Sequence, residues 1–186
     1  MKKGTKIYLY VLILIIIYYL ILPKGYILWY RGLPFYPKNS DEIKEVQYYV
    51  NNRSKEDEIF FRLTNINIVP VYEKIVNEDY NTLLKIATDL NPFCLFFKYL
   101  FNRARPKQID KNLDVLKDYG SADTPAFPAG HAIGGYYLSK VLIKKYPEKR
   151  EILEKLAYEC DLTRVKAGLH YPSDGLFSKY LVDNFF

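Results

Sequence analysis

The chain has 186 residues, of which 49% are apolar and 26% charged. This composition excludes an intrinsically disordered chain and allows one domain with an appendage. The formal net charge of +6 is uneven, because Lys2, Lys3, Lys6, Lys24 and Arg31 lie in a segment without acidic residues, which leaves 22 basic and 21 acidic residues in 32–186. A basic excess beside an apolar N-terminus is typical of membrane insertion, so we expect no nucleic-acid partner.

Residues 7–22 are sixteen consecutive apolar residues behind three lysines. As a helix they would span about 24 Å, slightly less than the roughly 30 Å hydrocarbon core, and the aromatic-rich residues 25–30 could extend that reach. A cleaved signal peptide and a buried core helix are the alternatives. The absence of a small-x-small cleavage site favours an uncleaved, single-pass anchor. The preceding lysines predict a cytosolic N-terminus and an extracytoplasmic or lumenal domain.

The pattern predicts three parts: a membrane anchor with its flanks (1–31), a Pro-containing linker (32–40) and a helical domain (41–186). Ser40 is expected to cap a first helix that buries Ile43, Val46 and Val50. Further helices are expected over 79–90, 91–101, 131–145, 147–167 and from Pro172 to near the end. Their expected inward residues are Leu83, Ala87, Leu90, Leu138, Val141, Leu142, Ile152, Leu156, Cys160, Leu176, Phe177, Tyr180 and Leu181. The domain is predicted to be an all-α helical bundle.

The two cysteines, Cys94 and Cys160, lie on apolar helix faces. A disulfide between them is conceivable in an extracytoplasmic domain, but free cysteine also behaves as a small apolar residue. We expect both to be free.

The chain contains only two histidines, His131 and His170. His170 immediately precedes the Tyr171-Pro172 start of the last helix, and Asp174 lies about one helical turn further on. A hydrogen bond between them would fix the tautomer of the imidazole and leave its other nitrogen with a lone pair, which makes a nucleophile. The other histidine, His131, follows Gly130 at the start of a predicted helix.

Three cations accompany these histidines. Lys98 and Arg105 both lie in the segment 98–106. Pro106 excludes helical geometry at Arg105, the residue before it. Arg164 lies near the end of the helix before His170, with Gly168 as its expected terminator. Such a set suits an anionic tetrahedral group, because arginine offers forked donors to phosphate oxygens.

These cations, histidines and Asp174 fall into three short motifs, each with a defined spacing: Lys98-x6-Arg105-Pro106, Pro128-Ala129-Gly130-His131, and Thr163-Arg164-x5-His170-x3-Asp174. Together they resemble the tripartite signature of the type 2 phosphatidic acid phosphatase and vanadium haloperoxidase superfamily, over about residues 79–186. The family has serine where this chain has Ala129 and Thr163. Threonine keeps a hydroxyl, whereas Ala129 lacks one that helps hold the phosphate in the family.

The resemblance implies a phosphatase of the helical-bundle type that needs no metal or other cofactor. Lys98, Arg105, Arg164 and the Gly130 amide would hold the phosphate of an ester, either lipid or soluble. His170, oriented by Asp174, would form a phosphohistidine, and His131 would act as general acid and then base. Residues 106–127 are expected to border the site. A vanadate-dependent haloperoxidase and a membrane protein with a decayed site are the alternatives, and the oligomeric state stays open.

Overall fold

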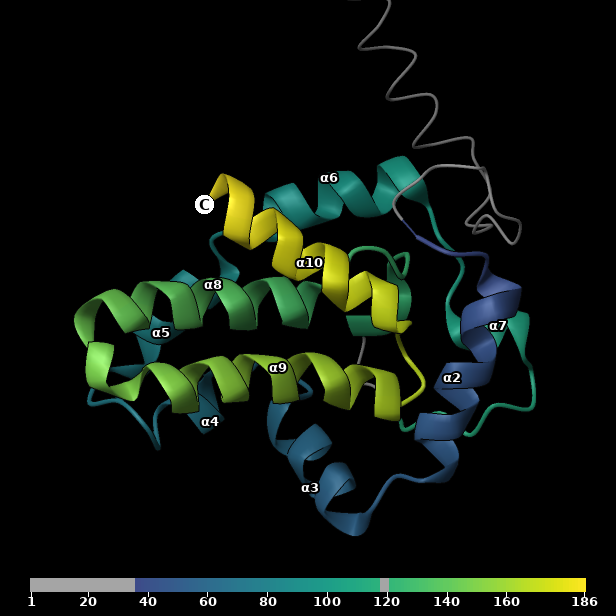
Figure 1. Cartoon of the computed structure of the whole chain (residues 1–186), viewed down its shortest axis with the longest axis horizontal. Coiled ribbons are helices and arrows are strands. Elements are labelled where there is room, and N and C mark those ends of the chain that lie inside the picture. The colour runs from purple at the N-terminus through teal and green to yellow at the C-terminus, as the bar shows by residue number, and fades with distance from the viewer. Residues whose placement is uncertain (1–35, 118–120) are drawn as a thin grey trace, which may run out of the picture.

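A computed structural model describes residues 36–117 and 121–186 of the chain (Figure 1). Within these ranges the chain forms helices and no strand, which confirms the all-α prediction. The expected anchor over residues 7–22 lies outside the described part. None of the helices in the described part combines the length and apolar character needed to cross a bilayer.

The bundle is built around α8 (Gly130–Lys145), which packs against α9 (Arg150–Lys166), α10 (Pro172–Phe185) and α5 (Tyr80–Thr88). The helices α8 and α9 run antiparallel through the short turn η2 (Pro147–Lys149), and α10 crosses beside α8 (Figure 1). The other elements are α2 (Asn39–Asn51), α3 (Lys55–Thr64), α4 (Val69–Tyr72), α6 (Asn91–Phe101), α7 (Pro106–Ile109) and η1 (Ser121–Asp123). The Ala129 amide, just before α8, donates to the Asp174 carbonyl in the first turn of α10, so the starts of α8 and α10 lie next to each other.

Local signals explain most helix boundaries. Ser54 and Asp57 form a capping box at the start of α3, and the Asp79 side chain accepts backbone hydrogen bonds at the start of α5. Proline occupies the first turns of α6, α7 and α10, where its missing N–H leaves no helical hydrogen bond unmade. The α6 boundaries are those expected from the sequence, with Asn102 in the left-handed conformation at the end.

One predicted cap is wrong. The helix α2 begins at Asn39, without a side-chain cap, and the Ser40 hydroxyl donates to the neighbouring Asp41 carboxylate instead. The reason is tertiary, because the buried Asn39 side chain accepts a 2.9 Å hydrogen bond from Arg103 Nε. The apolar face of α2 is as predicted, with Ile43, Val46 and Val50 buried.

The inward faces of the last two helices also differ from prediction. Ile152 is 49% exposed, because Gly135 of α8 lies against Ala157 and Cys160 and turns that side of α9 inward. Leu176 and Tyr180 are 68% and 53% exposed. The helix α10 instead buries a stripe that begins with small and polar residues and lets it approach its neighbours closely: Ser173, Asp174, Gly175, Ser178, Leu181 and Val182. Leu83, Ala87, Leu90, Leu138 and Leu142 are buried as expected. Cys94 and Cys160 are buried and free, as predicted.

Candidate active site

His170 lies in the short connection between α9 and α10. The helix α9 ends in a Schellman motif, in which the Gly168 amide donates to Val165 and the Leu169 amide to Arg164. Gly168 has φ of +76°, a left-handed conformation that glycine adopts without strain. The tight reversal brings Arg164 and His170 to one side of the connection.

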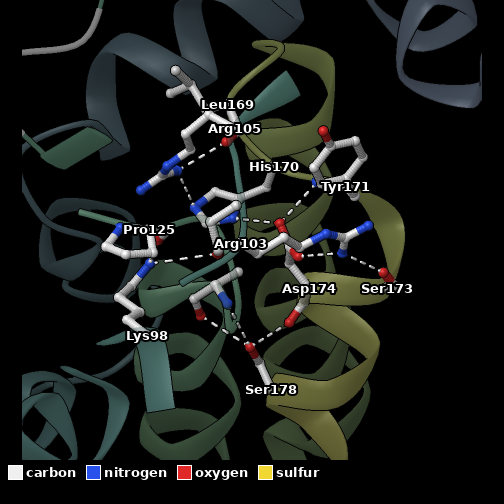
Figure 2. Close-up of polar contacts among 12 residues, drawn as sticks. Lys98, Arg103, Arg105, Pro125, Leu169, His170, Tyr171, Ser173, Asp174 and Ser178 are labelled. Carbon is white, nitrogen blue, oxygen red and sulfur yellow. Dashed lines mark hydrogen bonds and ion pairs between the residues drawn. The ribbon is translucent and has the colours of Figure 1, made fainter. Parts of the chain in front are cut away.

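The hydrogen bonds of His170 fix its tautomer (Figure 2). Nε2 lies 2.8 Å from Arg105 Nη1, and Nδ1 lies 2.9 Å from Asp174 Oδ2. A guanidinium only donates, so Nε2 must accept and carry a lone pair, and the proton must be on Nδ1, where the carboxylate accepts it. The imidazole is therefore neutral, with its nucleophilic nitrogen facing a cation.

Burial lowers the pKa of His170 well below its usual value, and the nearby positive charges of Arg105, Lys98, Arg164 and His131 lower it further. Both effects disfavour the imidazolium. The neutral imidazole thus persists into acidic solution.

Arg105 and Lys98 are held by backbone carbonyls at the inner side of the site. Arg105 Nε donates to the Thr124 carbonyl at 2.9 Å, and its Nη1 donates to the Leu169 carbonyl at 2.8 Å. Lys98 Nζ lies 2.5 Å from the Pro125 carbonyl (Figure 2). Burial, followed by the repulsion of Arg105, lowers the pKa of Lys98 to about 7. The end of the 106–127 connection therefore borders the site, as expected.

Asn65, between α3 and α4, contacts two of the predicted site residues. Its carbonyl lies 3.1 Å from His131 Nε2, and its side-chain oxygen accepts a 3.0 Å hydrogen bond from Arg164 Nη1. A carbonyl only accepts, so the Nε2 of His131 carries the proton. Arg164 is completely buried, and its guanidinium carbon lies 5.0 Å from the centre of the Phe61 ring.

A cavity of about 300 Å³ opens beside these groups. Exposed apolar side chains, Ile66 and Leu95, contribute to its lining together with the buried Lys98 and His170. Gly130, His131, Thr124 and Cys94 also line it, whereas Arg105 and Arg164 lie behind the lining. A Cβ on Gly130 would meet Cys94 Sγ at 3.7 Å, an ordinary contact, so glycine here keeps space open inside the cavity and relieves no clash.

The start of α8 is tied to α10 by Ser178. Its hydroxyl accepts the Ala129 amide at 3.0 Å and lies 2.7 Å from the Asp174 carbonyl, to which it can donate. The Ala129 amide also lies 3.2 Å from that carbonyl. Ala129 is fully buried, so it shapes the turn before Gly130 without entering the cavity.

Sequence reasoning missed Arg103, which is completely buried behind Asp174. Its Nη1 lies 2.7 Å from Asp174 Oδ1, and its Nη2 lies 2.6 Å from Glu42 Oε2 of α2. The guanidinium carbon lies 4.2 Å and 3.9 Å from the ring centres of Tyr36 and Tyr171. The repeated arginine of the Arg103-Ala104-Arg105-Pro106 run was the available signal for Arg103, whereas Glu42 resembled an ordinary first-turn acid.

The comparisons with known proteins agree with this architecture. The crystal structure of the first transmembrane PAP2 type phosphatidylglycerolphosphate phosphatase from Bacillus subtilis is similar with a TM-score of 0.51 and 18% identity, over 78% of this chain and 84% of that one. At this identity the similarity concerns the fold alone. A search of curated proteins finds no match. A family model described as the PAP2 superfamily matches residues 82–181, which include all three sequence motifs. The chain therefore belongs to the PAP2 superfamily.

Proposed function

We propose that this protein is a phosphatase that hydrolyses phosphomonoesters through a phosphohistidine, without a metal ion. One observation carries the proposal: His170 is neutral, with Nδ1–H on Asp174 and the Nε2 lone pair beside a cation at the cavity. A neutral imidazole with a fixed tautomer is a nucleophile, and clustered cations favour a phosphate as its target.

In the proposed first step, Lys98, Arg105, Arg164 and the Gly130 amide bind the phosphate oxygens. Arg105 turns its Nη1–H from His170 to the phosphate, which releases the Nε2 lone pair. Nε2 attacks phosphorus, the bond from phosphorus to the ester oxygen breaks, and His131, as the imidazolium, gives one proton to the leaving oxygen and becomes a neutral imidazole. Asp174 stabilises the positive charge on the phosphorylated imidazole.

In the proposed second step, His131, now without that proton, takes one from water as the water oxygen attacks phosphorus. The bond between phosphorus and Nε2 breaks, inorganic phosphate leaves, and both histidines return to their starting states. Lys98, Arg105 and Arg164 supply the positive charge that a metal ion supplies in other phosphatases. Their presence supports the proposal that the reaction needs no metal ion.

We also propose that residues 1–31 anchor the protein in a membrane, that 32–40 link the anchor to the domain, and that the domain lies outside the cytosol. The support is the sequence of residues 7–22 and the lysines before it. The substrate is a lipid or soluble phosphomonoester.

The decisive experiment measures phosphate release by the purified full chain in the presence of a chelator, with trapping of labelled enzyme by an alkaline quench, in which a phosphohistidine is stable. We expect activity to survive chelation and label to be trapped in the wild type. His170→Ala should remove both the label and the activity. A loss of activity on chelation that a divalent ion restores, or undiminished activity of His170→Ala, would overturn the proposal.

A further inference from the structure

The helix α6 carries an uncharged outer surface. Leu95, Phe96 and Leu100 are 41%, 58% and 55% exposed, whereas the single charged residue of the helix, Lys98, points inward and is 4% exposed. Surface helices normally expose a charged or polar face, so an apolar outer surface marks an interaction site. Phe186, 40% exposed, extends this surface through a ring contact of 5.0 Å with Phe93. We name these four residues (Leu95, Phe96, Leu100 and Phe186) the α6 face.

The α6 face is continuous with the lining of the active-site cavity. Leu95 belongs to both, and Ile66, 82% exposed, adds a second apolar side chain to the cavity lining. Among the polar residues that line the same cavity, Lys98 and His170 are buried, whereas Thr88 and Asn91 are exposed. An apolar partner that covered the α6 face would therefore lie at the cavity opening.

The polypeptide enters the domain next to α6. Tyr36, the first described residue, packs on Phe127 at 4.8 Å, and Phe127 packs on Phe101 of α6 at 5.1 Å. The apolar segment 7–22 ends fourteen residues before Tyr36. A chain of that length spans at most about 50 Å. A membrane anchor in residues 7–22 would thus tether the domain at its α6 end, within that distance of the bilayer.

We infer that the α6 face rests on the lipid bilayer and holds the cavity opening at the membrane surface. Uncharged aromatic and leucine side chains suit the interfacial region of a bilayer. The helix α6 lies at one edge of the bundle, so its exposed side chains can reach such a surface (Figure 1). The inference deepens the proposed function and rests on it for the identity of the cavity and for the anchor.

Photocrosslinking of the full chain tests the contact directly. Benzoylphenylalanine replaces Phe96 or, as the control, Tyr158 of α9, which is 51% exposed. The helix α9 lies on the opposite side of α8 from α6 (Figure 1). The protein is reconstituted in vesicles of phosphatidylcholine and phosphatidylglycerol with a labelled lipid. We expect labelled lipid adducts at position 96 at several times the yield at position 158. Equal yields, or crosslinks from position 96 to residues 7–22 of the chain itself, would overturn the inference.

An activity measurement separates this inference from the proposed function. The double variant Phe96→Ser/Leu100→Ser should hydrolyse a vesicle-embedded lipid phosphate about 10-fold or more slowly, with hydrolysis of soluble p-nitrophenyl phosphate unchanged. Tyr158→Ser should change neither rate. Unchanged hydrolysis of the lipid phosphate by the double variant would contradict the α6 inference alone. Absence of His170-dependent hydrolysis of either substrate by the wild type would overturn the proposed function, while the crosslinking result still decides the membrane contact.

Discussion

At the scale of single residues, the Asp174 carboxylate binds both His170 and Arg103, which have opposite effects on the protonation of the imidazole. Its Oδ2 accepts from His170 and from the Tyr171 amide, and its Oδ1 pairs with Arg103. A carboxylate beside an imidazole stabilises the imidazolium, whereas a cation on the same carboxylate weakens that effect. Arg103 therefore helps to keep His170 neutral while it holds Asp174 in place.

This arrangement predicts the effect of Arg103→Gln on the pH profile. Without the cation, Asp174 stabilises protonated His170 more strongly, so the pKa of His170 rises and the acidic limb of kcat/KM moves to higher pH. Steady-state kinetics across the acidic range measures the shift, with Arg62→Gln, an exposed arginine of α3, as the control. Because Arg103→Gln also leaves Glu42 buried without its partner, Glu42→Gln should be added to recover stability. A uniform loss of activity with an unmoved limb would show a purely structural role.

The two histidines should respond differently to the leaving group. His170→Ala removes the proposed nucleophile, so activity should fall to background with every substrate. His131→Ala removes a general acid, which typically contributes about 10² to 10⁴-fold, and the loss should shrink for esters with acidic leaving groups. Rates with a nitrophenyl and an alkyl phosphate measure the difference. Equal losses for the two variants with the nitrophenyl ester would contradict this division of roles.

At the scale of elements, the reversal between α9 and α10 sets the geometry of the site. Gly168 combines a φ of +76° with close neighbours, because a Cβ there would meet Val115, Leu113 and Val50 at 3.2 to 3.4 Å. The element that carries Arg164 and His170 thus depends on one residue without a side chain.

Gly168→Ala should therefore destabilise the fold by about 1–2 kcal/mol, the usual cost of a left-handed alanine, and should also raise KM because Arg164 and His170 shift. Denaturant unfolding and kinetics measure the two effects. The control is Asn102→Gly at the other left-handed position, φ 48°, which should change stability by less than about 0.5 kcal/mol. A Gly168→Ala variant with wild-type stability would contradict the strain argument.

The packing of α10 on α9 buries a second carboxyl group. Asp161 accepts a 3.0 Å hydrogen bond from Tyr136, and a Cβ on Gly175 would lie 2.0 Å from its carboxylate oxygens. Burial raises the pKa of Asp161 to about 7, against the lowering effect of Tyr136. Between the usual value near 4 and about 7 the folded state binds more protons than the unfolded state, so this carboxyl contributes stability at low pH that is lost as pH rises through 7.

Asp161→Asn should remove that pH dependence. The stability of the variant relative to the wild type, measured as the difference in the free energy required for unfolding, should be greater at pH 8 than at pH 5. Denaturant titrations at the two pH values measure the difference, and Glu151→Gln, at an exposed position of the same helix, is the control. A difference between variant and wild type that is the same at both pH values would contradict the assignment.

At the scale of the whole molecule, the fold gathers charge that the sequence distributes. Residues 32–186 are nearly neutral, yet Lys98 of α6, Arg105 before α7 and Arg164 of α9 surround one histidine closely enough to lower its pKa. A locally positive field of this kind attracts anions to the cavity.

The pKa of Lys98, about 7, makes that field sensitive to pH. As pH rises through about 7 Lys98 loses its charge, so kcat/KM should fall on the alkaline side. Lys98→Arg keeps the charge and should extend activity to higher pH, whereas the exposed Lys144→Arg should not. The pH profiles of all variants are measured with the same substrate, so the ionisation of the substrate phosphate contributes equally to each and cancels in the comparison. An identical alkaline limb in wild type and Lys98→Arg would show that another group sets it.

The sequence by itself determined the features that depend on neighbouring residues. Helical periodicity and prolines placed α6 and α10 at nearly the observed boundaries. The four-residue spacing brought His170 to Asp174, because the residues just before a helix lie close to the side chains of its first turn. The tertiary structure alone decided what depends on segments far apart in the chain. Glu42 reaches Arg103, Asn65 reaches both His131 and Arg164, and Leu176 turns outward. These contacts join residues with no local pattern between them, and packing of the helices chooses which side of each is buried.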